Sequence, residues 1–495
     1  MIMTDFDLSG LLEPQKAHAQ FLVESLIANG ISIDDSTTGT GKTYVGCAIA
    51  RHLKRKFVVI CPKIAIPMWK RVLASFGLTP EFVLNPEKLM RGNTPYYKRI
   101  SPAKYRAKYG LDDSVGEIPP FMCAEWKMPK DWIILIDEVH KCKGVESLNA
   151  GGLFNLKSEG YSVHGMSATL ATTPTDMRAT GYAVGLHSHG PDARFNQRAF
   201  KKFCEEAGAE WVGKWGAMYF DASNPESLAK LQVVHDYLHR WKKIASRLTR
   251  KDFGAIFPAT QVVTEAYDMG TASVAIKAVY DEMELELDLL EEHCANYKDH
   301  ILAIITKARR HAEMLKVPTI IDMVCDYNRE GRSAVVFVNY TATIEAIMLR
   351  LGKEFDPKLI GRIDGKTTAA EKEKAQQGFQ ADVLHFMVAN LAAGGQSINL
   401  HDILGVRPRS SIINPSYSAI SVLQSAGRID RAYTQSDVYQ RLLYAAGTIE
   451  ENVCRRFNDR SMFITALNDG TLTDADLIPT EKMIRFTRGL TGMIR

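Results

Sequence analysis

A glycine-rich stretch near the amino terminus has the residue types of a phosphate-binding loop. It reads DDSTTGTGKTYVG, from Asp34 to Gly46. Small residues let backbone amides converge on a phosphate, a lysine reaches its outer oxygens, and a hydroxyl group ligates magnesium. Ser36 replaces the first glycine of GxxxxGK[ST], which is tolerable because serine is small. We therefore expect ATP to bind at Thr38, Gly39, Thr40, Gly41, Lys42 and Thr43.

A pair of adjacent acids supplies the second half of a hydrolytic site. Asp137 and Glu138 end the apolar run WIILI. A carboxylate at a strand end can organise magnesium, and its neighbour can orient and deprotonate the attacking water. Alone, the pair would equally suit an acidic turn, but the phosphate loop favours catalysis. We predict Mg²⁺ ligands at Thr43 and Asp137, and catalytic roles for Glu138 and Lys42.

Alternating strands and helices must position these residues. The strand ISID precedes the loop, the helix KTYVGCAIARHL follows it, and FVVICP, WIILIDEVH and YSVHGMSAT read as buried strands. In open α/β sheets, chemistry collects where such strands end. The first part of the chain is therefore predicted to be an α/β domain with a parallel sheet.

The same architecture recurs from Ser333, with strands SAVVFVNY, VLHFMVAN, SSIINP and VYQRLLYAA and intervening helices. Between the two series, the pattern from Thr271 to Asn328 is mostly helical, and its acidic stretch DEMELELDLLEE reads as a solvated helix face. We expect a first lobe at 1–265, a helical region at 266–330, a second lobe at 331–467 and a basic tail at 468–495.

Composition excludes several classes of protein. The chain has 495 residues, 46% of them hydrophobic, with a net charge of +4 and eight cysteines that form no CxxC pair. No apolar run reaches the roughly 20 residues of a membrane helix, and scattered cysteines argue against disulfide frameworks and zinc ribbons. We expect an intracellular protein, in the cytoplasm or nucleoid or in a host cell if viral, without a membrane partner.

The order of motifs resembles that of superfamily 2 helicases and translocases, whose core is two RecA-like lobes that close on ATP. Gln15 stands where this family reads adenine, and ICPKIAIPMWKR and FVLNPEKL resemble nucleic-acid-facing motifs Ia and Ib. GMSATL resembles motif III, which couples nucleotide to nucleic acid. The resemblance implies coupling roles for His140, Ser167, Ala168 and Thr169.

The second lobe carries the matching motifs IV to VI. FVNYTATI resembles motif IV, LAAGGQSINL with Gly395 resembles motif V, and the run from Gln424 to Arg431 matches QxxGRxxR of motif VI. Arginines at i and i+3 lie on one helix face, so we expect Arg428 and Arg431 to reach the γ-phosphate together. The resemblance implies a catalytic role for Gln424 and an ATP contact for Gly395.

Three features look like the Swi/Snf branch of duplex-DNA translocases: Trp69 in motif Ia, SRLTRKDFGAIFP and GTIEENV. The chain departs from that branch with GTGKT for GLGKT, SATL for TATP and RAYTQ for RxGQ, so DNA-unwinding or restriction-motor relatives also fit. The resemblance runs from Leu12 to Leu467 and suggests a minimal motor such as phage or viral genomes encode.

A basic segment from Gly92 to Gly110 contains no acid and interleaves cations with tyrosines. Cations can neutralise backbone phosphates and rings can stack on bases, although a solvated loop whose rings pack is about as plausible. The segment His239–Lys251 reads as a basic surface helix. Expected nucleic-acid contacts are Lys63, Trp69, Lys98, Arg99, Lys104 and Arg106.

Together these features predict an ATPase that moves on nucleic acid. Translocation along duplex or branched DNA, with remodelling or annealing as the output, is the preferred interpretation. A strand-separating DNA or RNA helicase is the first alternative. An idle nucleic-acid-binding scaffold and a motor subunit of a restriction or defence complex are the others.

Overall fold

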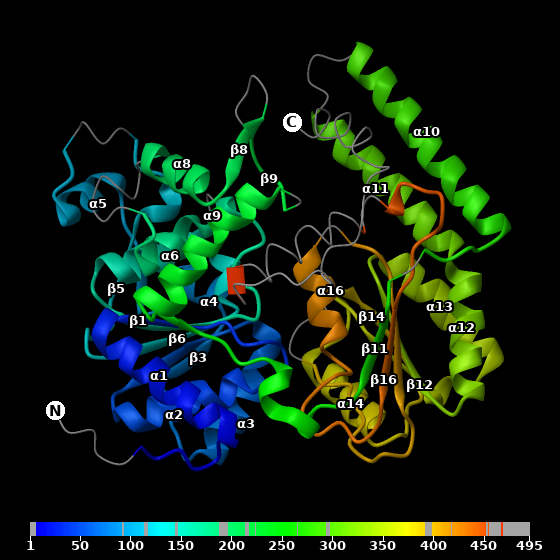
Figure 1. Cartoon of the computed structure of the whole chain (residues 1–495), viewed down its shortest axis with the longest axis horizontal. Helices are drawn as coiled ribbons and strands as arrows, with labels where there is room; N and C mark the ends of the chain where they lie inside the picture. The colour runs from blue at the N-terminus through cyan, green and yellow to red at the C-terminus, as the bar shows by residue number, and fades with distance from the viewer. Residues whose placement is uncertain are drawn as a thin grey trace. The chain divides into compact units, whose positions relative to one another are not determined.

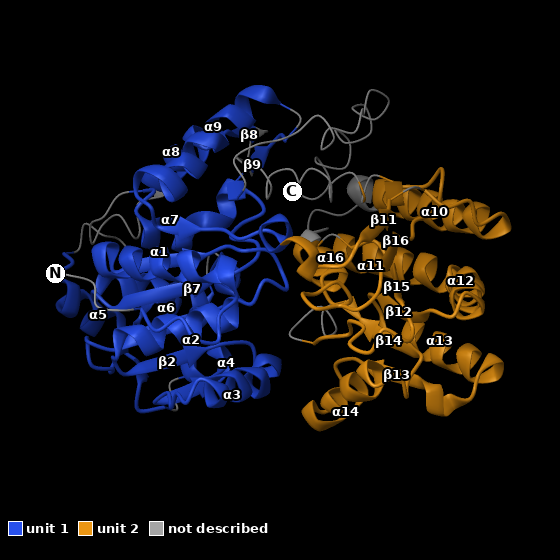
Figure 2. Ribbon diagram, turned by 60° about the horizontal axis from the view of Figure 1, so that its bottom comes forward, with its two compact units in different colours: residues 1–253, 459–476 blue, residues 254–458, 477–495 orange. Residues whose placement is uncertain are grey.

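The computed structural model describes residues 6–91, 94–112, 117–143, 147–187, 197–212, 217–222, 224–264, 266–293, 298–391, 398–416, 418–451, 454 and 467–468. The chain forms two compact units (Figures 1 and 2). The first runs to Phe253 and includes Leu467 and Asn468, and the second begins at Gly254. Each unit has its own parallel sheet.

The sheet of the first unit has the strand order β10-β1-β7-β6-β2-β3, and all its pairings are parallel. Alternate residues of β6 face opposite sides: Ile134 and Ile136 enter one apolar cluster, while Ile133 and Leu135 enter another. Helices therefore cover both faces. The strands are β1 Ile31–Asp34, β2 Phe57–Ile60, β3 Phe82–Leu84, β6 Ile133–Asp137, β7 Ser162–Met166 and β10 Ala245–Ser246.

Helices α1 (Glu13–Asn29), α2 (Lys42–Leu53) and α3 (Ile66–Ser75) contribute to the same cluster as Leu135, whereas α6 (Leu148–Ser158) packs with Ile134 on the opposite face. Two small antiparallel sheets pair β4 with β5 and β8 with β9. The remaining elements of the first unit are α4 Pro86–Met90, β4 Tyr97–Arg99, α5 Pro102–Tyr109, β5 Ala124–Trp126, α7 Arg178–Val184, α8 Gln197–Glu206, β8 Ala209–Val212, β9 Ala217–Phe220 and α9 Pro225–Asp236.

The sheet of the second unit has the order β11-β16-β15-β12-β14-β13, again with parallel pairings. In its centre, Val336 of β12 lies opposite Val388 and Ile412 of the flanking strands. Helices α12 and α13 cover one face, while α14 and α16 lie on the other (Figure 1). The elements are β11 Thr260–Val263, α12 Val317–Arg329, β12 Ser333–Val338, α13 Thr341–Glu354, β13 Ile360–Ile363, α14 Ala369–Gln380, β14 Phe386–Asn390, β15 Arg409–Ile413, α16 Ala419–Ala426 and β16 Val438–Leu442.

The helical region between the two series is part of the second unit. Helices α10 (Thr271–His293) and α11 (Lys298–Leu315) lie side by side and share an apolar cluster that includes Met283 and Ala312 (Figure 1). Strand β11, inside the range 1–265 that we expected for the first lobe, instead pairs with β16. The edge strand of the second sheet thus comes from before the helical region.

Two parallel sheets flanked by helices confirm the predicted pair of RecA-like lobes. The prediction of a surface helix across His239–Lys251 is wrong. This segment starts with a π-helical turn, Tyr237–Trp241, and then adds β10 beside β1, with Ala245 opposite Ile33. Parallel pairing outweighs the local helical spacing there. Among the helices that the structure describes, none is both long and apolar enough to cross a bilayer.

Candidate nucleotide site

The phosphate loop connects the end of β1 to the start of α2, and its glycines are required by its shape. Gly39 and Gly41 have φ angles of 88° and 89°, in the left-handed region that favours glycine. A Cβ atom on Gly41 would lie 2.3 Å from Nε2 of Gln15. A side chain at Gly41 would therefore both strain the backbone and displace Gln15.

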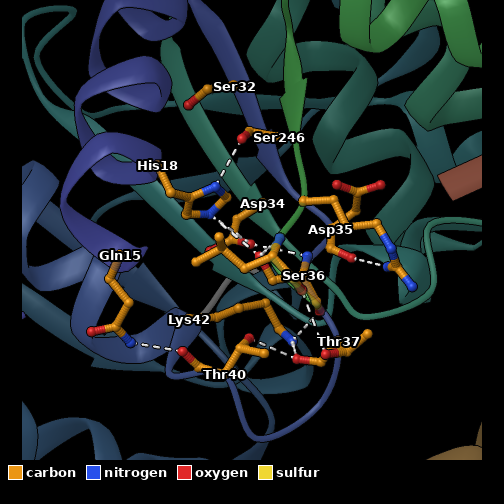
Figure 3. A network of polar contacts seen from close by, with 12 residues as sticks. Gln15, His18, Ser32, Asp34, Asp35, Ser36, Thr37, Thr40, Lys42 and Ser246 are labelled. Atoms are coloured by element: carbon orange, nitrogen blue, oxygen red, sulfur yellow. Dashed lines mark hydrogen bonds and ion pairs between the residues drawn. The ribbon is translucent and has the colours of Figure 1, made fainter. Parts of the chain in front are cut away.

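Lys42 opens α2 and folds back over the loop. Its Nζ donates to the carbonyl oxygens of Ser36 at 2.7 Å and Thr37 at 3.1 Å (Figure 3). The amino end of a helix carries partial positive charge and unpaired N–H groups, so this end of α2 and the Lys42 ammonium suit an anion. Thr43 lies beside Lys42 in the first helical turn.

Gln15 is buried against this loop. Its Nε2 donates to the carbonyl oxygen of Thr40 at 2.7 Å, and its Oε1 accepts from the backbone N–H of Leu12 at 2.8 Å. Both halves of the amide therefore bond inside the protein, and Figure 3 shows the bond to Thr40. The residue that the motif order associates with adenine is, in this structure, a support of the phosphate loop.

Asp137 and Glu138 lie where β6 ends. Burial, and then the adjacent charge of Glu138, raise the pKa of the Asp137 carboxyl above its ordinary value. The hydrogen bond from Trp69 and the charge of Lys42 act in the opposite direction. Glu138 has a φ of 58°, a left-handed conformation that is strained for a residue with a side chain. Two neighbouring carboxylates in a desolvated position favour a bound cation.

A chain of contacts links Glu138 to the end of β7. Nδ1 of His140 lies 3.1 Å from Oε2 of Glu138 and 2.9 Å from Oγ of Ser167. The Ser167 hydroxyl donates to the carbonyl oxygen of Thr169 at 2.7 Å. The structure thus brings together three of the four residues expected to couple the nucleotide site to the nucleic-acid track.

Ala168, the fourth of these residues, contacts a residue that motif reasoning missed. Its carbonyl oxygen accepts a hydrogen bond from Nδ2 of Asn468 at 3.3 Å. The neighbouring Leu467 is buried in the core of the first unit, and its carbonyl oxygen lies 2.9 Å from Nδ1 of His235. No local sequence signal indicates this return of the chain to the first unit.

Trp69 is misassigned as a nucleic-acid contact. Its side chain has no exposed surface, and its indole N–H donates to Oδ2 of Asp137 at 2.9 Å. The ring packs between α2 and α3, where a Cβ on Gly46 would lie 3.3 Å from it. Trp69 therefore supports the acid pair instead of meeting a partner at the surface.

The basic segment keeps its cations outside and its rings inside. Lys98, Arg99 and Lys104 are exposed, as is Lys63 in the turn after β2, whereas Arg106 is half-buried. Arg99 donates to the carbonyl oxygen of Pro120 and Arg106 to that of Asp112, each at 2.6 Å. Tyr97 and Tyr105 are fully buried, so these two rings pack in the core and are not available to stack on bases.

Motif VI is arranged differently from the prediction. Helix α16 ends at Ala426, so Arg428 and Arg431 follow the helix and do not lie on its face. The chain turns after Gly427, and the Leu400 N–H donates to the carbonyl oxygen of Arg428 at 2.9 Å. Both guanidinium groups instead reach the carbonyl oxygen of Ile398, at 3.3 Å and 3.4 Å. Gln424 is buried in α16, and Gly395 lies outside the described residues.

The donors of the first unit fit a magnesium nucleotide. Within the described ranges, no group of three or more His, Cys, Asp or Glu side chains could hold a metal alone. Mg²⁺ requires no such group, because it commonly takes one or two protein oxygens together with substrate phosphates and water. The hydroxyl of Thr43 and the carboxylate of Asp137 are donors of that kind.

Comparisons with known proteins identify the family of the chain. The family model for the helicase conserved C-terminal domain matches residues 315–433. A protein of Acanthamoeba polyphaga mimivirus named "Putative ATP-dependent RNA helicase" is 30% identical over 465 residues, covering 92% of this chain and 83% of that protein. The solved SWI2/SNF2 ATPase core of Sulfolobus solfataricus in complex with dsDNA is 15% identical with a TM-score of 0.33, covering 93% of this chain and 94% of that one. From the mimivirus relative and the domain match, the chain belongs to the superfamily 2 helicases and translocases.

Proposed function

We propose that this protein hydrolyses ATP to translocate along duplex or branched DNA. The observation that carries the ATPase part is the arrangement of Lys42 over the phosphate loop with Asp137 and Glu138 at the end of a strand in the same sheet. The preference for duplex DNA rests on the Swi/Snf-like sequence features.

ATP binding requires Lys42 to change partners. Its ammonium leaves the carbonyl oxygens of Ser36 and Thr37 and pairs with the outer phosphates, while the amino end of α2 holds the phosphate chain. Bound Mg²⁺ would neutralise phosphate charge during the transfer, with Thr43 and Asp137 as its protein ligands. Gln15 keeps Thr40, and with it the loop, in position.

Hydrolysis depends on Glu138. Its carboxylate accepts a proton from the attacking water, and the adjacent His140 ring fixes its orientation. We assign to Arg428 and Arg431 the stabilisation of the negative charge that develops on the transferred phosphoryl group. We assign to the Ser167 and Thr169 contacts the coupling of the nucleotide state to the nucleic-acid surface.

A strand-separating helicase is the second candidate, favoured by the name of the mimivirus relative. Two assays with ATP separate the candidates: displacement of a third strand from a DNA triplex, and unwinding of forked DNA and RNA duplexes. Triplex displacement without unwinding supports the translocase. RNA unwinding without triplex displacement rejects it in favour of the second candidate.

A further inference from the structure

Two side chains of α1 hold opposite ends of the phosphate loop (Figure 3). Gln15 and His18 are three residues apart, so they lie on one face of the helix. Gln15 donates to Thr40 near the end of the loop, and His18 contacts Ser36 at its beginning. Both side chains are buried, at 3% and 4% exposure, so neither contact competes with bulk water.

His18 uses both ring nitrogens. Nε2 lies 3.2 Å from Oδ1 of Asp34 and 3.3 Å from Oγ of Ser36, while Nδ1 lies 2.8 Å from Oγ of Ser246 on β10. The ring therefore ties α1 to the end of β1, to the loop and to the neighbouring edge strand (Figure 3). An imidazole bonded on both sides has a fixed orientation.

Every polar group of Ser36 makes a hydrogen bond. Its N–H donates to Oδ1 of Asp34 at 3.1 Å, its Oγ accepts from the N–H of Leu248 at 2.9 Å, and its carbonyl oxygen accepts from Lys42. A glycine, the usual residue at this place in the motif, would lack the hydroxyl contacts to His18 and Leu248. The serine therefore gives this loop an anchor to the sheet.

Asp34 supplies the charge of this network. Burial alone raises the pKa of the Asp34 carboxyl, but the charge and hydrogen bond of His18 and the charge of Lys42 outweigh burial and hold the pKa below its ordinary value. The carboxylate has no exposed surface. A buried charge needs compensation, and Lys42 is the group that ATP would recruit. His18 would then compensate the charge of Asp34 whether or not ATP is bound.

We propose that His18 is a positioning residue for ATP binding, fixing Ser36 through Asp34 and through the Ser36 hydroxyl so that the loop keeps its shape when Lys42 turns to the phosphates. The proposal rests on the proposed ATPase function of the same loop. His18 does not touch the reacting atoms, and its effect falls on nucleotide affinity instead of the hydrolytic step.

The test measures binding of a fluorescent ATP analogue, together with KM and kcat for ATP, in the full-length chain. His18→Leu is expected to raise Kd and KM about tenfold while kcat stays within about threefold, because a hydrogen-bonded charge loses its partner. His18→Gln restores a donor and is expected to recover most of the affinity. His187→Leu is the matched control, since His187 is also a buried histidine of the first unit but its Nε2 lies 3.0 Å from the carbonyl oxygen of Arg178.

Equal ATP affinity in wild type and His18→Leu, or an equal loss in His187→Leu, would overturn the role of His18 while leaving the ATPase proposal intact. A wild-type chain that binds no ATP would overturn the proposed function itself. Should His18→Leu fail to fold, Ser36→Ala decides, because it removes only one hydroxyl. If Ser36→Ala binds ATP as tightly as wild type, the proposed role of the Ser36 hydroxyl is wrong. A loss of ATP affinity of about threefold or more would support that role.

Discussion

Trp69 donates its indole N–H to Oδ2 of Asp137 across 2.9 Å, from a side chain with no exposed surface. This bond favours the ionised form of a carboxyl group whose pKa is raised by burial and by the charge of Glu138. Trp69→Phe keeps most of the ring volume and removes the donor. We predict that kcat for ATP falls about tenfold and that half-maximal activity needs more Mg²⁺, as expected when a hydrogen bond to a charged group is lost.

Phosphate release across a Mg²⁺ titration measures both effects. Trp126→Phe is the control, because the buried Trp126 donates its indole N–H to the carbonyl oxygen of Gly152, away from the acid pair. The same loss in both variants would show that the effect comes from packing and not from Asp137.

Glu138→Gln tests the assignment of the general base. The amide keeps the size of the side chain but cannot accept the proton, so we predict retained ATP binding with hydrolysis reduced by about 10² to 10⁴. Glu159→Gln is the comparison, because Glu159 is a buried acid that accepts from Lys108, Lys130 and Tyr109 on another part of the first unit. Undiminished turnover in Glu138→Gln would contradict the assignment.

Arg428 and Arg431 share one acceptor in the second unit, the carbonyl oxygen of Ile398. Lysine keeps the charge but not the planar fork, so Arg428→Lys and Arg431→Lys are each predicted to slow hydrolysis by about 10³ with little change in ATP binding. Arg329→Lys, at an exposed position paired with Asp326, should have no effect. Wild-type rates in both motif VI variants would refute the role that we assign to them.

The shifted pKa of His164 predicts how the stability of the folded chain depends on pH. Burial lowers its pKa to about 4, against 6.5 for an unperturbed histidine. Between these values the unfolded chain binds a proton that the folded chain does not, so stability falls as the pH falls from 6.5 to 4, by up to about 1.4 kcal/mol per pH unit. His164→Leu removes this dependence. The stability difference between wild type and variant should therefore shrink from pH 7 to pH 5.

Urea unfolding followed by tryptophan fluorescence makes this measurement, because all six tryptophans lie before Phe253 and report on the first unit. A difference that stays constant or grows on acidification would show that His164 is not held neutral in the folded state.

The strands of both sheets and the helices that cover them could be predicted from the sequence where hydrophobic residues recur with a clear period. Helix α2 begins at Lys42 and ends at Leu53, as the pattern indicated, and β1 ends at Asp34. Long apolar runs such as WIILI have few alternatives to a buried strand. The positions of the phosphate loop and the acid pair follow from these boundaries.

Contacts between distant segments could not be predicted in this way. Strand β10 has only two residues, and its place beside β1 depends on backbone pairing that leaves no local pattern. Two signals conflict at Trp69: its place in motif Ia predicts a nucleic-acid contact, whereas its spacing from Val72 and Leu73 is that of a buried helix face, and the structure follows the spacing. His18 had one available signal: a polar residue three positions after Gln15 on the face that packs against the sheet.

The motif VI arginines show that helical spacing in the sequence does not guarantee that the helix continues through them. Their i, i+3 spacing would place them on one helix face, but α16 ends at Ala426, two residues before Arg428. Gly427 favours such an end, since glycine is common where helices stop. The side chains nonetheless converge, through backbone turns and the shared Ile398 carbonyl instead of helical periodicity.

Phosphate release from ATP, measured with and without nucleic acid, tests the central claim most directly. The account predicts slow hydrolysis by the protein alone, stimulation by duplex DNA that exceeds stimulation by single-stranded DNA or RNA, and no stimulated activity in Glu138→Gln. A hydrolysis rate that no nucleic acid changes, or one that persists in Glu138→Gln, would contradict it.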